Sequence, residues 1–149
     1  MKTAIRPGPA TAIAAVVAAA IAAMTAVSAE AADLRLTLRT QGAGGSIAIA
    51  VYGNAADFRA SRNPVMSRII PAPGGATTVT LTGLPPGRYA VGAFHDADSN
   101  GELTLWPIGL PKEAYGFSRD ARGRFGPPAF DAAAFDLPVA GTQQAITLR

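Results

Sequence analysis

Short stretches of alternating apolar and polar residues dominate the chain beyond residue 30. In residues 33–40 (DLRLTLRT) leucine fills every second position, and residues 46–52 (SIAIAVY) and 77–82 (TTVTLT) show a similar alternation. Successive side chains of a strand point to opposite faces, so each stretch predicts a β-strand with one buried face and one face in water. Residues 88–96 (RYAVGAFHD) are small or apolar on both faces, which predicts a central strand.

Turn signals between these stretches indicate how the strands pair. Residues 41–45 (QGAGG) predict a hairpin between the strands at 33–40 and 46–52. Residues 83–87 (GLPPG) predict a turn, because paired prolines fix φ and the following glycine is free to adopt unusual angles.

The pattern is weaker elsewhere, but it still favours strands. Residues 65–70 predict a less regular strand, residues 134–139 and 144–149 predict a hairpin closed by Gly141-Thr142, and residues 55–62 have room for one helical turn. No segment keeps a helical period over three turns. About seven short strands separated by turns predict an all-β fold, namely an antiparallel β-sandwich.

One long segment breaks the alternation. Residues 106–130 are rich in glycine and proline, yet they carry five aromatic residues: Trp106, Tyr115, Phe117, Phe125 and Phe130. Disordered linkers are poor in aromatic residues, so we expect a long ordered loop near the C-terminal hairpin. Such loops are often functional, although rings that only cap the core would give the same pattern.

The first 29 residues have the layout of a secretory signal peptide. Lys2 and Arg6 precede an apolar, alanine-rich run, and cleavage after Ala29 or Ala31 fits the small-x-small rule. An uncleaved membrane anchor is the alternative, but the run is about as short as a spanning helix can be. We therefore expect a signal peptide at 1–29, one domain at 30–149, a periplasmic or extracellular location, and no membrane span after cleavage.

Charge and cysteine content exclude some classes of function. The chain has 13 basic and 10 acidic residues, and removal of Lys2 and Arg6 leaves 11 against 10. Nucleic-acid binding needs a clustered basic surface, so no nucleic-acid partner is expected. The chain has no cysteine, hence no disulfide, and core packing must stabilise the domain.

Two blocks in the second half of the chain resemble a known family. They are GLPPGRYAVGAFHDADSNGEL at 83–103 and GLPKEAYGFSRDARGRFGPPAFDAAAF at 109–135. In these blocks the chain is similar to the secreted bacterial proteins catalogued as domain of unknown function 2141. The resemblance implies an immunoglobulin-like or prealbumin-like β-sandwich. It implies neither an activity nor catalytic residues.

Residues 96–102 (DADSNGE) match the first half of a calcium loop. Asp96, Asp98 and Asn100 stand at the first, third and fifth positions. Gly101 supplies the sharp turn at the sixth position, and Glu102 offers its carbonyl oxygen at the seventh. Because Ca²⁺ prefers hard oxygen ligands, these residues predict a calcium site, with Ca²⁺ as the candidate cofactor.

The second half of the calcium loop is missing. Pro107 stands at the twelfth position instead of a bidentate glutamate, and Thr104 is a weak ligand at the ninth. Glu113 would supply the missing carboxylate if the chain folds back. A metal-free turn explains the same letters, since aspartate and asparagine bond their own backbone and Asn-Gly favours turns. Both alternatives stay open.

Six residues of the aromatic loop form a candidate ligand site for a glycan or another component of the cell envelope. They are Trp106, Lys112, Tyr115, Arg119, Arg122 and Arg124. Guanidinium groups beside aromatic rings suit carboxylate and phosphate groups. The alternative is that arginine stems cover the rings while their charged ends stay solvated.

Catalytic and zinc motifs are incomplete. A hydrolase would use Ser118 with His95, but residues 116–120 (GFSRD) lack the last glycine of Gly-x-Ser-x-Gly. Zinc usually needs histidine and cysteine ligands, and this chain has one histidine. We therefore expect a non-enzymatic exported β-sandwich module that acts by binding or in the cell envelope. A calcium-binding module, and an enzyme or enzyme accessory with a site in residues 95–125, are the alternatives.

Overall fold

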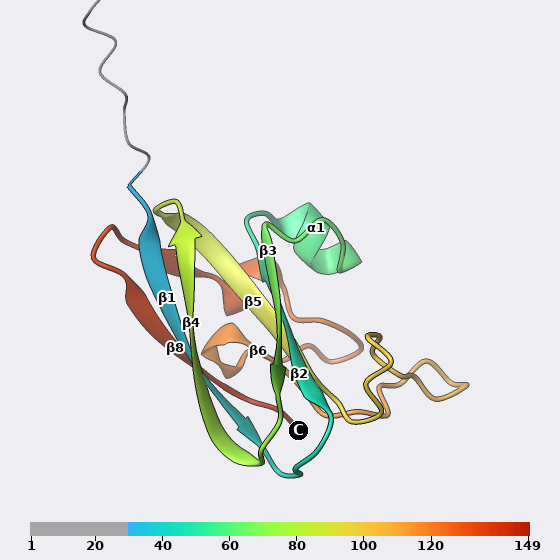
Figure 1. The fold of residues 1–149 in the computed structure, drawn as a ribbon. Coiled ribbons are helices and arrows are strands. Elements are labelled where there is room, and N and C mark those ends of the chain that lie inside the picture. Colours follow the sequence, from blue (N-terminus) through green and yellow to red (C-terminus); the bar gives the residue numbers. More distant parts are fainter. Residues whose placement is uncertain (1–29) are drawn as a thin grey trace, which may run out of the picture.

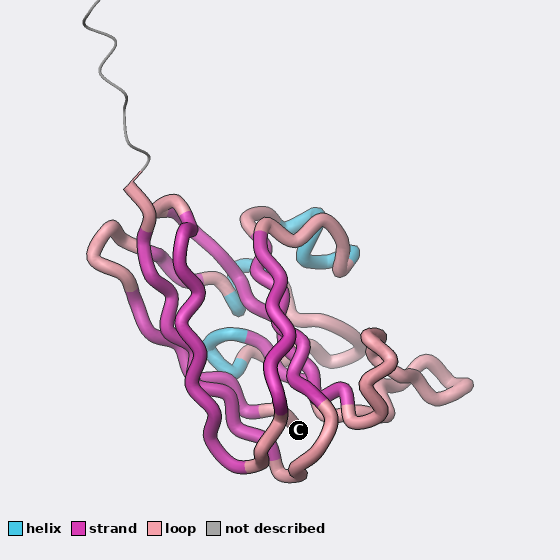
Figure 2. Tube along the Cα trace, viewed as in Figure 1, coloured by secondary structure: helices cyan, strands magenta, loops and turns pink. Residues whose placement is uncertain are grey.

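The computed structural model describes residues 30–149, and the predicted signal peptide lies outside this part of the chain. Eight strands and three short helical segments make up the described part (Figures 1 and 2). The strands are β1 (Ala32–Thr40), β2 (Ser46–Tyr52), β3 (Met66–Pro71), β4 (Gly75–Leu84), β5 (Gly87–Asp96), β6 (Tyr115–Phe117), β7 (Phe135–Leu137) and β8 (Thr142–Thr147). The helical segments are α1 (Ala55–Ala60), the 3-10 turn η1 (Ser118–Asp120) and α2 (Phe130–Ala133).

The strands form two sheets that pack against each other, which confirms the predicted all-β sandwich. One sheet has the order β4-β1-β8, and the other has the order β3-β2-β5-β6, with β7 also paired to β5. All pairs are antiparallel except β1 with β8, which run parallel. The more specific likeness to immunoglobulin-like or prealbumin-like sandwiches stays a prediction.

Both predicted hairpins are wrong. β1 pairs with β4 and β8, whereas β2 pairs with β3 and β5, so residues 41–45 carry the chain from one sheet to the other. Likewise β7 pairs with β5, and β8 pairs with β1. Alternation specifies which face of a strand is buried, but it leaves the neighbour open. Two strands that face each other from different sheets bury their apolar sides as completely as two strands paired in a hairpin, so the same sequence pattern fits both arrangements.

The core lies between the two sheets and is built from the alternating residues. Leu34, Leu36 and Leu38 of β1 and Ile47 and Val51 of β2 are fully buried. Complete burial of one such side chain contributes about 1.5–3 kcal/mol. The prediction that each strand buries its apolar face is therefore confirmed, and β5 lies in the middle of its sheet as expected.

A second, smaller cluster covers the outer face of the larger sheet. Phe58 of α1 is 2% exposed, and its ring meets those of Tyr52, Phe117 and Phe130 edge-on at 5.6–5.9 Å between centroids. Edge-to-face contacts of this kind stabilise aromatic clusters. The helical turn expected at 55–62 is confirmed, and Asn54 caps it by accepting a hydrogen bond from the Asp57 amide.

The two sheets join along β6 and the chain end after β8. The backbones of Tyr115 and Arg149 exchange two hydrogen bonds of 3.1 Å. The Asp120 carboxylate accepts a hydrogen bond from the Thr147 amide at 2.8 Å. These contacts fix the position of β6, which follows directly after the candidate site along the chain. Within the described residues no helix has the length and apolar character needed to cross a membrane.

Candidate functional site

The candidate site begins where β5 ends. Asp96 is the last residue of this strand and is only 2% exposed. Its Oδ1 accepts a hydrogen bond from the Asn100 amide at 3.0 Å, and its Oδ2 accepts one from the Gly101 amide at 2.8 Å. Asp and Asn side chains commonly close turns by binding backbone amides in this way. The turn over residues 96–101 is therefore organised around one buried carboxylate.

The returning strand brings a second acidic residue to this turn. β6 pairs with β5 in a register that places Phe94 opposite Tyr115, and the His95 amide donates to the Ala114 carbonyl at 2.8 Å. Continuing the register places Glu113 beside Asp96, although the two lie far apart in sequence. Antiparallel pairing thus supplies the carboxylate that the calcium-loop pattern lacked.

Glu113 is held in place by the loop that it faces. Its Oε1 accepts a hydrogen bond from the Ala97 amide at 3.1 Å, and its Oε2 accepts one from the Thr104 amide at 3.0 Å. Both ends of the intervening loop are therefore tied to a single side chain. This arrangement fixes the carboxylate before any ligand arrives.

Three carboxylates converge at this point. One oxygen each from Asp96, Asp98 and Glu113 lies within 4.8 Å of the other two. Oxygens that share one Ca²⁺ at about 2.4 Å from the ion lie no more than about 4.8 Å apart. Since a carboxylate oxygen has two lone pairs, an oxygen that accepts an amide hydrogen bond still has a free lone pair for a cation. The cluster is thus compatible with a divalent ion.

The site favours negative charge on Asp96. Burial by itself would raise the pKa of this carboxyl, but hydrogen bonds from the Gly101 and Asn100 amides outweigh burial and lower the pKa. Asp96 is therefore ionised at neutral pH. Among the described residues the only ion pair joins Arg88 and Asp131, so the carboxylate cluster has no ion-pair partner there, although Lys112 lines the same groove.

The other two predicted metal ligands occupy less direct positions. The Asn100 side-chain nitrogen donates to Asp98 Oδ2 and to Thr104 Oγ1, both at 3.2 Å. Its amide oxygen accepts a hydrogen bond from the Glu102 backbone at 2.8 Å. The Glu102 side chain is exposed and is not among the three converging carboxylates. Asn100 thus supports the turn, and Glu113 is the third acidic member.

An open groove of about 420 Å³ lies beside the cluster. Its lining consists of His95, Ala97, Asp98, Thr104, Lys112, Glu113 and Ala114. Two of the clustered carboxylates thus face a space that solvent can enter. An ion or a small polar ligand can approach them from this side.

The residues of the hydrolase alternative serve the fold. Ser118 is completely buried, where its hydroxyl donates to the Ala133 carbonyl at 2.5 Å and accepts from the Val91 amide at 2.9 Å. His95 is 8% exposed, and its Nε2 lies 2.6 Å from the Gly44 carbonyl oxygen. His95 is therefore a hydrogen-bonded strand residue. Ser118 is not placed to act as a nucleophile.

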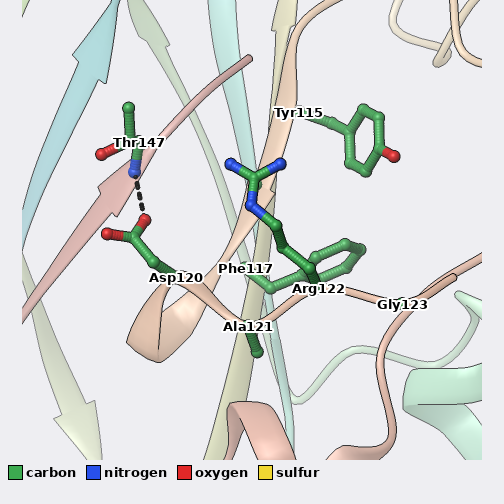
Figure 3. A pocket seen from close by; sticks show the side chains of 8 residues that line it. Tyr115, Phe117, Asp120, Ala121, Arg122, Gly123 and Thr147 are labelled. Carbon is green, nitrogen blue, oxygen red and sulfur yellow. Dashed lines mark hydrogen bonds between the residues drawn. The ribbon is translucent and has the colours of Figure 1, made fainter.

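The six predicted ligand-loop residues fall into different surroundings. Lys112 lies over the Trp106 ring, with 5.3 Å from Nζ to the ring centroid. Arg119 donates to the Ala134 carbonyl at 3.3 Å, and Arg124 is exposed. Tyr115 and Arg122 line a separate pocket of about 60 Å³, shown in Figure 3.

The pocket at Tyr115 and Arg122 is small. Figure 3 shows that Asp120, on the opposite side, is turned to the Thr147 backbone. A volume of about 60 Å³ holds only a few water molecules. This pocket is therefore much smaller than the groove beside the carboxylate cluster.

Sequence reasoning found part of this site and missed the rest. Asp96 and Asp98 were indicated by their spacing. Glu113 was only a conditional ligand, because its approach depends on the pairing of the three-residue strand β6 with β5. The alternation of glycine with aromatic residues at 115–117 is the one signal in the sequence for that strand.

The comparisons with known proteins give a family and no relative of known activity. The family model described as "Uncharacterized protein conserved in bacteria (DUF2141)" matches residues 39–147. No curated protein and no solved structure matches the chain.

Proposed function

The chain belongs to the uncharacterized bacterial family DUF2141, and from this starting point we propose that it is an exported, non-enzymatic β-sandwich module. Its task is binding, in the periplasm or outside the cell, through the loops between β5 and β6. The layout of residues 1–29 supports export. If export is correct, mass spectrometry of the protein recovered from the host will find an N-terminus after Ala29 or Ala31. Recovery of the chain with Met1 in place would contradict export.

The use of Ser118 and His95 within the fold supports a non-enzymatic role. Nucleophilic catalysis needs a hydroxyl beside a base and within reach of substrate. The Ser118 hydroxyl instead connects β5 to α2 in the interior. Its position leaves the hydrolase alternative without its nucleophile.

A second candidate function, calcium binding, is favoured by one observation. Asp96, Asp98 and Glu113 bring three carboxylates together without an ion-pair partner among the described residues. Mutual repulsion of like charges disfavours this arrangement, whereas a divalent cation relieves it. The Glu102 carbonyl and the Thr104 hydroxyl are further oxygen donors of the same loop.

The binding strength follows from the number of charged ligands. Three carboxylates, two of which line an open groove, resemble the weaker extracellular calcium modules, with a Kd of about 10⁻⁴–10⁻³ M. Such an affinity suits a compartment in which calcium is abundant. The ion would stabilise the loop between β5 and β6 and set the position of its surface groups.

Isothermal titration calorimetry with calcium chloride tests this proposal. Wild-type protein should bind calcium, and Asp98→Asn and Glu113→Gln should weaken binding roughly tenfold, since each removes one charged ligand. Asp98→Asn keeps the oxygen that accepts the Asn100 amide, so the fold is expected to persist. Glu113→Gln keeps only one of the two oxygens that accept the Ala97 and Thr104 amides, so Asp98→Asn is the cleaner variant. Asp136→Asn, which changes an exposed carboxylate on β7, is the matched control. The absence of binding at millimolar calcium would contradict the proposal.

A further inference from the structure

A short apolar finger projects from the loop between β5 and β6. We use this name for residues 103–111 (LTLWPIGLP), which follow the carboxylate turn. Leu105 and Pro111 form a bridge between its two legs, and the Trp106 amide donates to the Leu110 carbonyl at 2.8 Å. The Lys112 amide donates to the Thr104 carbonyl at the base, also at 2.8 Å. The finger is therefore a hydrogen-bonded hairpin. Figures 1 and 2 show this part of the chain extending away from the sheets.

The finger exposes large apolar side chains to solvent. Leu105 and Trp106 are each 52% exposed, Leu110 is 58% exposed and Ile108 is 78% exposed. These four make up half of the large apolar side chains that the described residues leave exposed. Single exposed apolar residues are common, but a contiguous group marks an interaction surface.

Charge is absent from the finger and present at its base. No residue from 103 to 111 carries a charge, whereas Glu102 precedes the finger and Lys112 follows it. An uncharged tip is complementary to hydrocarbon. At the base, Lys112 stands beside Glu102 and the three clustered carboxylates. This acidic surplus suits a zwitterionic headgroup surface better than an anionic one, which would repel it. Lys112 also covers part of the Trp106 ring with its amine, as lysine does when its stem follows an apolar surface.

The dimensions and the shape of the finger fit the same partner. Legs of about four residues reach roughly 13 Å, at about 3.3 Å per residue. Interfacial segments enter the headgroup and acyl boundary to a depth of about 5–10 Å. A fluid bilayer adapts to a convex tip, while a folded protein partner would need a matching groove. Tryptophan prefers the membrane–water boundary, where its ring is apolar and its N–H stays wet.

We propose that the finger anchors the domain to a phospholipid surface. Ile108 and Leu110 enter the acyl boundary, Trp106 lies at the level of the headgroups, and Lys112 stays at the surface. The interaction is interfacial and reversible, because the apolar area of one hairpin is far smaller than that of a spanning helix. It adds to the proposed binding role a defined surface on which the module works.

Trp106 provides the test, since it is the only tryptophan of the chain. The full chain is mixed with phosphatidylcholine vesicles in the presence of a chelator, so that calcium has no part in the result. Trp106 fluorescence should shift to shorter wavelength, and lipids brominated near the headgroup should quench it. Ile108→Asp should reduce partitioning roughly tenfold or more, because a buried charge is unfavourable in lipid.

Matched controls separate the finger from the rest of the chain. Val139→Asp changes another exposed apolar residue, 52% exposed, between β7 and β8, and it should partition like the wild type. Residues 1–29 are identical in all variants, so the readout is the shift and quenching of Trp106, which report the environment of the finger rather than attachment through residues 1–29. Trp106 emission that vesicles leave unchanged would overturn the proposal, as would Ile108→Asp with the same shift and quenching as the wild type. Dimerisation lost in Ile108→Asp, without vesicle binding, would assign the finger to a second copy of the chain and would also overturn it.

Discussion

The Ser118 hydroxyl accepts a hydrogen bond from the Val91 amide and donates one to the Ala133 carbonyl. One small side chain therefore links β5, η1 and α2 in the interior. Removal of one partner from a buried hydrogen-bonded pair leaves the other group without water or protein contact.

Ser118→Ala should lower the free energy of unfolding by about 1–3 kcal/mol, because two buried backbone groups lose their partner. Urea denaturation measures this loss. Ser67→Ala, at an exposed position of β3, should change stability by less than about 0.5 kcal/mol. Reaction of Ser118 with a serine-directed fluorophosphonate in the folded protein would contradict a structural role and revive the hydrolase alternative.

The ionisation of Asp96 makes the stability of the turn at residues 96–101 depend on pH. The Gly101 and Asn100 amides lower its pKa in the folded state, against the opposing effect of burial. A lowered pKa contributes stability at pH values above the unfolded pKa of about 4, and this contribution disappears as pH falls through the folded value.

In a chelator, the free energy of unfolding should therefore fall between about pH 5 and pH 3, and it should fall less steeply in Asp96→Asn. Urea denaturation at a series of pH values measures both slopes. Asp57 also has a lowered pKa, but it is unchanged in the variant, so the difference belongs to Asp96. Equal slopes would show that the Asp96 carboxylate gains nothing from the turn.

At the scale of elements, the position of β6 decides whether the site exists. Gly116 of β6 approaches β8 so closely that an added Cβ would lie 2.6 Å from the Thr147 carbonyl oxygen. This approach fixes β6 between β5 and the end of β8. Glu113 follows from that placement, because it continues the same strand direction towards Asp96.

Gly116→Ala should consequently destabilise the domain by about 1–3 kcal/mol, since the added methyl group meets backbone that has no room to move. Gly42→Ala is the control, because its Cβ would make an ordinary contact of 3.6 Å with His95. Chemical denaturation compares the two variants. Equal stability of both would mean that the contact between β6 and β8 is looser than the structure shows.

The buried face of each strand was easier to predict than the strands with which it pairs. The leucines of β1 and the apolar residues of β2 were expected to be buried, and they are. The hairpin between these strands was expected and is wrong, because period-two patterns describe one strand at a time. The position of Glu113 was uncertain for the same reason. It depends on the pairing of the three-residue strand β6 with β5, which no local sequence pattern predicts.

At the scale of the whole molecule, the proposed functional surface lies at the end of the sandwich where β5 leaves and β6 returns. The loop between them carries the carboxylate cluster at its base and the apolar finger at its tip. Of the predicted aromatic residues, Phe117 and Phe130 do cap the sheet, whereas Trp106 and Phe125 are exposed. The long loop thus serves both the fold and the surface.

The proposed calcium site also has a consequence for the stability of the whole domain. An ion that binds only the folded state stabilises it by mass action. With a Kd of about 10⁻⁴ M, calcium at about 10 mM should add roughly 2.7 kcal/mol. That gain corresponds to a rise in melting temperature of roughly 5 °C or more for a domain of this size.

The most direct test is a thermal melt of the full chain in calcium and in chelator, repeated for Asp98→Asn and for the control Asp136→Asn. The expected result is a higher melting temperature in calcium for the wild type and for Asp136→Asn, with most of the rise lost in Asp98→Asn. Magnesium at the same concentration should give a smaller rise, because it demands a tighter octahedral site. A wild-type melting temperature that is the same in calcium and in chelator would contradict the calcium site.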